Sequence, residues 1–392
     1  MPQLRASYKP NDTLKKVGYA FTYGNKVINI DPANIVDAQF TWDANDMCVE
    51  GYVLFDDVYR VSEMLPPVNT ILFRMSGTDF SGMTYEEKFV ITRIEKQYSN
   101  NRKMSVMIEL IDTAYYYLGN TYVSKGYNNI RIDQIAKDIV SNRSIFPNGI
   151  TQKLINFYPT NNTYENMVIP TERPFTAFIK QKELTDGFSF YQSRKEIVML
   201  SHDKIETHLP DIYGNGEGIK FTFDDVDDTI NPFKIKTLRF IPSDNLLFNA
   251  VLPDTMVYQF DQSNMSNPDV RIKDVGRFSK TLGDDSTLLS MNSTTGFKRL
   301  EATNHDSIDR FYKFKLLENY LIEITVSGMF AYELLWKVGL ELKSTIDGHK
   351  NMMPYVNGGY TILKIVDKYQ GTSFNQIITL GRVGVSLNNL KG

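Results

Sequence analysis

The chain has 392 residues, with 43 lysines and arginines against 46 aspartates and glutamates, so its formal net charge is −3. This balance argues against a dedicated nucleic-acid binder, because such proteins turn a basic surface toward the phosphates. The single cysteine, Cys48, excludes an intrachain disulfide, and no stretch reaches the ~18 apolar residues of a membrane-spanning helix. We therefore expect a chain of roughly two to four domains, with no membrane insertion and with assembly in a cytoplasm.

The first part of the chain has the pattern of short β-strands. In KVINIDP, the apolar residues alternate with polar ones, which is typical of a half-buried strand. The segments EKFVITRIEKQY and KMSVMIELID are two further strands, and the SNNR between them indicates a hairpin. Short strands at this spacing predict a small β-barrel over residues 1–120.

The pattern changes after residue 120. NNIRIDQIAKDIVSN places Ile132, Ile135, Ala136 and Ile139 at helical spacing. A second helix is predicted in RPFTAFIKQKELTDG, with Gly187 at its end, and a β-hairpin follows. Residues 121–230 are therefore predicted to form an α/β unit.

Strand patterns return in NPFKIKTLRF and again in YLIEITVSG, WKVGLELKS, GYTILKIVDKY and FNQIITLGR. We assign residues 231–262 and 306–392 to a second β-barrel. The polar, turn-rich residues 263–305 between them are predicted to be an insertion of irregular or β structure.

One strand pattern occurs twice. YTILKIVDKY follows FVITRIEKQY at an offset of 271 residues, and the two have three identities in ten positions. Each copy begins a hairpin, and an offset of 270 also pairs Val68 with Val338 and Leu72 with Leu342. The predicted fold class is therefore α+β, with two similar small β-barrels that arose by internal duplication; coincidence between two unrelated hairpins is the alternative. The matched residues are Phe89 with Tyr360, Ile91 with Ile362, Ile94 with Ile365, and Tyr98 with Tyr369.

The order of these elements resembles the central baseplate hub proteins of contractile-tailed bacteriophages. Phage late control proteins and the hub part of type VI secretion spikes are related to them. The resemblance rests on a barrel, IDQIAKDIV, RPFTAFIKQKELTDGFSFY, a helix leading into YLIEITVSGMFAYELLWKVGLELKS, and the terminal hairpin. It is one of pattern, without a diagnostic motif. The apolar loop SGMFAYELLWKV departs from the polar, proline-containing loop that is usual there.

The resemblance implies a structural virion protein in the tail baseplate. Such hubs are homotrimers that adapt a six-fold tail tube to a three-fold central spike around an axial channel through which the genome leaves. The implied partners are the tube protein, the spike protein and other baseplate proteins, with DNA only in transit. An acidic chain suits such a channel, because a basic lining would bind phosphates.

No catalytic, metal or cofactor site is predicted. SHDKIETH contains His202, Asp203, Glu206 and His208, but its spacing differs from that of a zinc helix. FDDVDDT lacks the alternation and glycine of a calcium loop, and GNGEG opens no predicted helix that could cradle phosphate. A glycan- or receptor-binding tail protein and, less favoured, a cell-wall hydrolase remain as alternative functions.

An apolar loop is the candidate assembly interface. If it is exposed, it would be a partner-binding patch, because large exposed apolar patches mark interfaces and aromatic residues act as anchors. If it is buried, it belongs to the core of the second barrel. Its residues are Met329, Phe330, Tyr332, Leu335 and Trp336.

Overall fold

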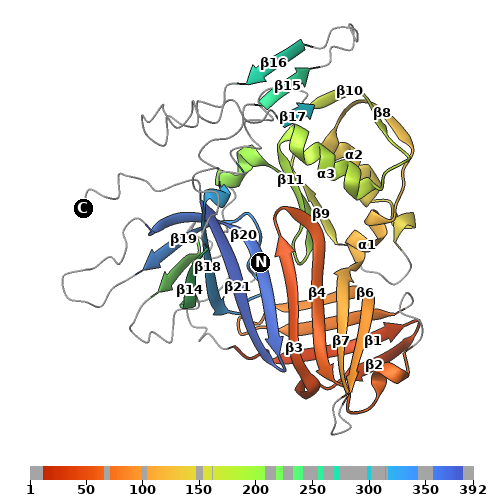
Figure 1. Cartoon of the computed structure of the whole chain (residues 1–392), viewed down its shortest axis with the longest axis vertical. Coiled ribbons are helices and arrows are strands. Elements are labelled where there is room, and N and C mark those ends of the chain that lie inside the picture. Colours follow the sequence, from red (N-terminus) through yellow and green to blue (C-terminus); the bar gives the residue numbers. More distant parts are fainter. Residues whose placement is uncertain are drawn as a thin grey trace, which may run out of the picture.

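The computed structural model describes residues 12–65, 71–98, 104–146, 153–160, 162–207, 218–223, 233–241, 255–259, 269–273, 298–301, 314, 317–342 and 356–382. Strands dominate, and the α-helices of this part of the chain lie together beside one end of the largest sheet (Figure 1). The chain is an α+β protein, as the sequence predicted. None of the described helices has the length and apolar character that a membrane span requires. The helices are α1 (Thr113–Gly119), α2 (Ile132–Val140) and α3 (Phe175–Asp186), with short 3-10 turns at Pro32–Asn34, Val61–Glu63, Arg143–Ile145, His202–Thr207 and Leu317–Asn319.

Thirteen strands form one large sheet. Its strands follow the order β14-β18-β21-β20-β3-β4-β7-β6-β5-β1-β2, and β19 pairs with both β20 and β13. All pairs are antiparallel except β13 with β19. The strands are β1 (Lys16–Tyr23), β2 (Lys26–Ile30), β3 (Ile35–Asp43), β4 (Asp46–Asp56), β5 (Leu72–Thr78), β6 (Thr84–Tyr98), β7 (Met104–Asp112), β13 (Lys220–Phe223), β14 (Ile235–Ile241), β18 (Tyr320–Ser327), β19 (Lys337–Leu342), β20 (Gly358–Gln370) and β21 (Ser373–Arg382).

The two barrels predicted from the sequence are joined in this sheet, and the described strands close no barrel. The reason is the length of β20. Its first residues pair with β19, and its second half, Lys364–Tyr369, pairs along the same edge with β3. A long strand can bond two partners in succession, so β20 links strands from both ends of the chain.

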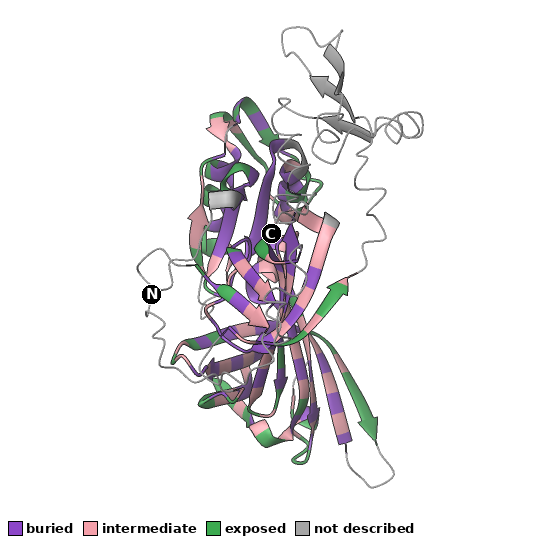
Figure 2. Ribbon diagram, turned by 90° about the vertical axis from the view of Figure 1, so that its left-hand side faces the viewer, coloured by how far each residue is buried: buried purple, intermediate pink, exposed green. Residues whose placement is uncertain are grey.

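The core is shared across this junction. Along β3 and β7, buried residues alternate with more exposed ones, as Figure 2 shows for the strands of the large sheet. Phe40 of β3 stacks on Phe89 of β6 with ring centroids 4.6 Å apart. The same ring meets the edge of Tyr369 of β20 at 6.0 Å. One hydrophobic cluster therefore includes residues from both predicted barrels.

The middle of the chain has a core of its own. The predicted apolar stripe of α2 is confirmed, because Ile132, Ile135, Ala136 and Ile139 are all buried. Helix α3 ends at Gly187, whose φ of 67° is the left-handed conformation that glycine favours. Two small sheets complete this core: β8 (Lys125–Arg131) with β10 (Thr163–Ile169), and β11 (Phe188–Gln192), β12 (Glu196–Ser201) and β9 (Leu154–Phe157).

A separate three-stranded sheet falls largely within the predicted insertion. Strand β15 pairs with β16 antiparallel and with β17 parallel. Because β15 starts at Thr255, this sheet begins before residue 263, where the predicted insertion starts. Its strands are β15 (Thr255–Gln259), β16 (Asp269–Lys273) and β17 (Lys298–Glu301).

Candidate functional site

The apolar loop lies inside the molecule. Met329, Phe330, Tyr332, Leu335 and Trp336 have exposed fractions of 0–4%, so in the single chain they have the second of the two roles considered above, that of core residues. The Phe330 ring stacks on Phe374 with centroids 4.9 Å apart and lies 5.3 Å from Tyr85.

A buried arginine holds this loop in place. Arg194 stands in the turn between β11 and β12 and reaches into the large sheet. Its Nη1 donates a hydrogen bond to the carbonyl of Tyr332 at 2.9 Å, and its Nη2 lies 2.6 Å from Asp367 Oδ1. The guanidinium also lies 4.7 Å from the centre of the Trp42 ring, a cation–π contact. One side chain thereby connects the middle unit, β3, β20 and the loop.

Asp367 is the acceptor at the centre of this network. The amide of Gln376 donates to its Oδ1 at 2.7 Å, and the Tyr369 hydroxyl donates to its Oδ2 at 3.0 Å. Gln376 also accepts a hydrogen bond from the backbone N–H of Met329 at 2.7 Å. Such a fully bonded acid is tolerated in a core because its charge is paired.

The sequence analysis did not identify Arg194 or Asp367. A signal was present, because Asp367 lies two residues from both Ile365 and Tyr369 in a strand and so shares their core-facing side. A charged residue at a core-facing strand position indicates a buried partner.

A second buried ion pair joins the middle unit to the first strands. Lys153 Nζ lies 2.9 Å from Glu87 Oε2 of β6, and both side chains are less than a tenth exposed. Burial raises the pKa of Glu87, and the lysine opposes that shift. The Tyr85 hydroxyl donates to the same Glu87 oxygen at 2.8 Å.

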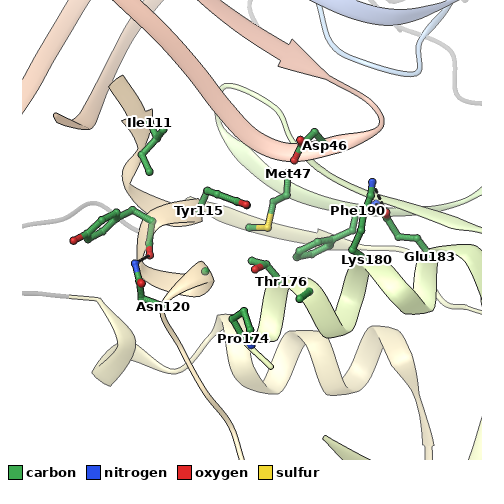
Figure 3. Close-up of a pocket in the computed structure, with 13 residues that line it drawn as sticks. Asp46, Met47, Ile111, Tyr115, Asn120, Pro174, Thr176, Lys180, Glu183 and Phe190 are labelled. Carbon is green, nitrogen blue, oxygen red and sulfur yellow. Dashed lines mark hydrogen bonds and ion pairs between the residues drawn. The ribbon is translucent and has the colours of Figure 1, made fainter. Parts of the chain in front are cut away.

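A pocket of about 470 Å³ opens where the β3–β4 turn meets α1 and α3 (Figure 3). Lys180 and Glu183 lie at one end and Asn120 at the other. Burial raises the pKa of Glu183 to about 7, against the opposing effect of Lys180 Nζ at 2.7 Å. Its other oxygen accepts the backbone N–H of Phe190.

The carboxylates of the pocket bear on the alternative function of a glycosidase. A glycosidase site needs two carboxylates facing a scissile bond. The two carboxylates in the pocket lining are Asp46 and Glu183, and both are engaged by their own chain. The Asp46 side chain accepts the backbone N–H of Cys48 at 2.9 Å, and Glu183 fixes the start of β11 against α3. The described contacts therefore favour a structural role for both acids.

No group of three metal-ligating side chains occurs among the residues that the structure describes. His202 is a packed histidine: its Nε2 lies 3.0 Å from the Ser189 hydroxyl, and its ring stacks on Phe314 at 4.4 Å. His208, residues 224–228 and residues 214–217 lie outside the described residues.

The repeated strand residues lie in two hairpins, β6–β7 and β20–β21. Phe89, Ile91, Tyr360 and Ile362 are all buried. Ile94 is partly buried and Ile365 is fully buried. Only the last pair differs strongly, because Tyr98 is 68% exposed whereas Tyr369 is 0% exposed. Strand β3 covers the edge of β20 beside Tyr369.

No protein-family model matches the chain, and no curated protein matches it. Solved structures do match. The tail protein from Neisseria meningitidis MC58 is 11% identical, with a TM-score of 0.57 and coverage of 94% of this chain and 97% of that one. The 43 kDa tail protein of prophage MuSo2 from Shewanella oneidensis is 8% identical, with a TM-score of 0.55 and coverage of 94% and 99%.

A third matching structure comes from a secretion system. The E. coli c3393 protein is 10% identical, with a TM-score of 0.51 and coverage of 94% of this chain and 77% of that one. It is described as a component of the type VI secretion system with structural similarity to the bacteriophage T4 tail proteins gp27 and gp5. At these identities the shared property is the fold. The resemblance to phage tail and baseplate proteins predicted from the sequence is thereby confirmed as a likeness of fold.

Proposed function

We propose that this chain is a structural subunit of a trimeric hub in a phage tail baseplate. Three copies form a ring around an axial channel for genome passage, and the ring adapts a six-fold tail tube to a three-fold central spike. The chain acts by shape and contact rather than by catalysis. The shared fold of tail proteins supports this proposal, and so does the regularity of the large sheet described next.

The observation that carries the proposal is a repeated strand arrangement. The strands β3-β4-β7-β6-β5 and β14-β18-β21-β20-β19 follow each other in the same order in the two halves of the sheet. The cross-strand pairs also correspond: two residues that face each other in the first half have counterparts that face each other in the second half. Gly51 faces Leu110, and Ile322 faces Leu380; Ile94 faces Ile108, and Ile365 faces Ile378.

The irregularities recur as well. The pairing of β6 with β7 shifts between Ile91 and Arg93, and that of β20 with β21 shifts between Ile362 and Lys364, 271 positions later. The pairing of β3 with β4 shifts between Ile35 and Asp37. The pairing of β14 with β18 shifts between Ile235 and Thr237, 200 positions later. A register shift bends a strand locally and tends to be kept within a family. Its recurrence at corresponding positions therefore supports an internal duplication.

One part of the predicted alignment is wrong. The offset of 270 paired Leu72 with Leu342. In the structure Leu72 faces Val90. The counterpart of Val90 at the offset of 271 is Thr361, and Thr361 faces Lys337, so Lys337 is the counterpart of Leu72. The offset for this strand is therefore 265, and Val68 lies outside the described residues.

Two similar units in each chain explain the symmetry of the proposed ring. Three chains would present six similar units on one side while the whole assembly keeps three-fold symmetry. The net charge of −3 suits a channel that DNA crosses without binding.

Light scattering coupled to size exclusion, over a concentration series, tests this proposal. We expect a mass three times 45.0 kDa that persists on dilution. Electron microscopy of that species should show a ring with six similar densities. A monomer at every concentration, or a ring of another order, would contradict the proposal.

A further inference from the structure

The two halves of the sheet meet at one strand pair. There, β3 of the first half lies against the second half of β20, with Phe40 facing Asp367 and Ala38 facing Tyr369. One side of this junction is apolar and belongs to the core. The other side is polar, with Lys364 near Asp43 at 3.9 Å.

The counterparts of these two strands are unpaired at the corresponding edges. The counterpart of β3 is β14, and the counterpart of Lys364–Tyr369 is residues 93–98 of β6. Among the described strands, β14 itself pairs only with β18, whereas Lys234 just before it bridges Thr222 of β13; residues 93–98 pair only with β7. Figure 1 shows β14 and β6 on opposite sides of the molecule.

These edges carry large exposed apolar side chains among charged ones, which are Arg93, Glu95 and Lys96 on β6 and Lys236 and Arg239 on β14. Proteins normally blunt a free strand edge with charges, prolines or a cover. Here Tyr98 is 68% exposed and Phe240 of β14 is 41% exposed, which places two of the large exposed hydrophobic residues on the two open edges.

We propose that β14 of one copy of this chain adds, antiparallel, to residues 93–98 of β6 in the next copy. This inference rests on the proposed ring and identifies the surfaces that would form it. The junction inside the chain fixes the register: Phe240 faces Lys96, Arg239 faces Gln97, and Leu238 faces Tyr98. An edge on one side of each copy meets a different edge on the next, which is the head-to-tail contact that generates rings.

The side chains fit this register. On one face, Leu238 and Phe240 would lie beside Tyr98 and the aliphatic stem of Lys96, and this face corresponds to the apolar side of the internal junction. On the opposite face, Arg239 and Glu95 become diagonal neighbours of opposite charge. A slip of one residue would move Leu238 and Phe240 away from Tyr98 and onto the face of Glu95 and Gln97, so the two registers differ in which side chains share a face.

Disulfide trapping in the full-length chain tests the register. In a Cys48→Ser background, Gln97→Cys combined with Arg239→Cys should give a covalently linked trimer on oxidation, seen on a non-reducing gel. The matched control is Lys368→Cys with Gln39→Cys, the equivalent pair inside the chain, which faces across β20 and β3. It should form an intrachain disulfide without any covalent oligomer. Gln97→Cys with Phe240→Cys, one residue out of register, should remain uncrosslinked.

A second variant tests the same contact without cysteines. Phe240→Asp places a charge in the apolar face and should shift the mass from three chains to one. Val168→Asp is the control, because Val168 is an exposed strand residue of β10, outside the large sheet; its exposed fraction is 69%, against 41% for Phe240. That variant should leave the mass unchanged.

The outcomes separate this inference from the proposed function. A trimer that forms no 97–239 crosslink and keeps its mass with Phe240→Asp overturns the edge pairing and leaves the hub proposal standing. A 97–239 crosslink in an assembly other than a trimer supports the pairing and contradicts the three-fold hub. A monomer without crosslinks overturns both.

Discussion

Arg194 and Asp367 form an ion pair of 2.6 Å at the centre of the molecule, where their side chains are 4% and 0% exposed. The pair joins residues 173 positions apart, one from the middle unit and one from the large sheet. Removal of Arg194 would leave the charge of Asp367 buried without its positive partner.

We therefore predict that Arg194→Ala lowers the free energy of unfolding by about 3–5 kcal/mol. Urea denaturation measures this change. Arg74→Ala is the control, because Arg74 pairs with Glu86 at a similar 2.7 Å while both side chains are more than a third exposed. That loss should be at most about 1 kcal/mol. Equal losses in the two variants would contradict the role assigned to Arg194.

The buried carboxyl of Glu183 should make stability depend on pH. Its pKa is raised from 4.5 to about 7, so the folded state holds the proton more tightly than the unfolded state. The resulting stabilisation is complete below about pH 4.5 and is lost as the pH rises through about 7. The loss amounts to about 3 kcal/mol.

The measurement is the free energy of unfolding from pH 5 to pH 8 for the wild type and for Glu183→Gln. The difference between the two curves isolates the effect of Glu183 from that of other acids whose pKa is raised, among them Glu333. Parallel curves for the two proteins would show that Glu183 does not titrate in this range.

Gly51 of β4 should not tolerate a side chain. A Cβ at this position would lie 2.4 Å from the backbone carbonyl oxygen of Gln39 and 2.6 Å from the Phe40 ring. We predict that Gly51→Ala destabilises the fold by about 1–3 kcal/mol, as overpacking does. Gly126→Ala in β8 is the matched control, because nothing lies within 4 Å of its Cβ. The measurement is the melting temperature of each variant relative to the wild type. An unchanged melting temperature for Gly51→Ala would contradict the prediction.

Phe330 should act on stability rather than on assembly. Its ring is 3% exposed between Tyr85 and Phe374, so Phe330→Ala should lower the free energy of unfolding by about 3–5 kcal/mol. Tyr59→Ala, at a residue 71% exposed, should change it little. The mass of the folded Phe330→Ala variant should equal that of the wild type. A dissociated but equally stable variant would instead support an interface role for the loop.

Local patterns predicted local structure well. The stripe of α2, the glycine at the end of α3 and the strands of both hairpins follow from periodicities that neighbouring residues set. The pairing of β3 with β20 has no such signal, because it joins residues more than 300 positions apart and depends on which edges remain free.

The loop around Trp336 shows another limit of sequence reasoning. Its apolar composition fits both a core segment and a binding patch, and only the surrounding strands decide between them. The outcome depends on Arg194 and Asp79, whose side chains bond the backbone of Tyr332 and Phe330. Neither residue is near the loop in sequence.

The connection between β14 and β18 explains how the second unit can carry additional chain. In the first unit a short turn leads from β3 to β4, and Asp43 faces Asp46 beside it. In the second unit Ile241 faces Leu321, so the chain leaves and re-enters the sheet at neighbouring positions. The chain between these two positions includes β15, β16 and β17. Because the chain leaves and re-enters at neighbouring positions, the length of this connection can change without moving any strand of the large sheet.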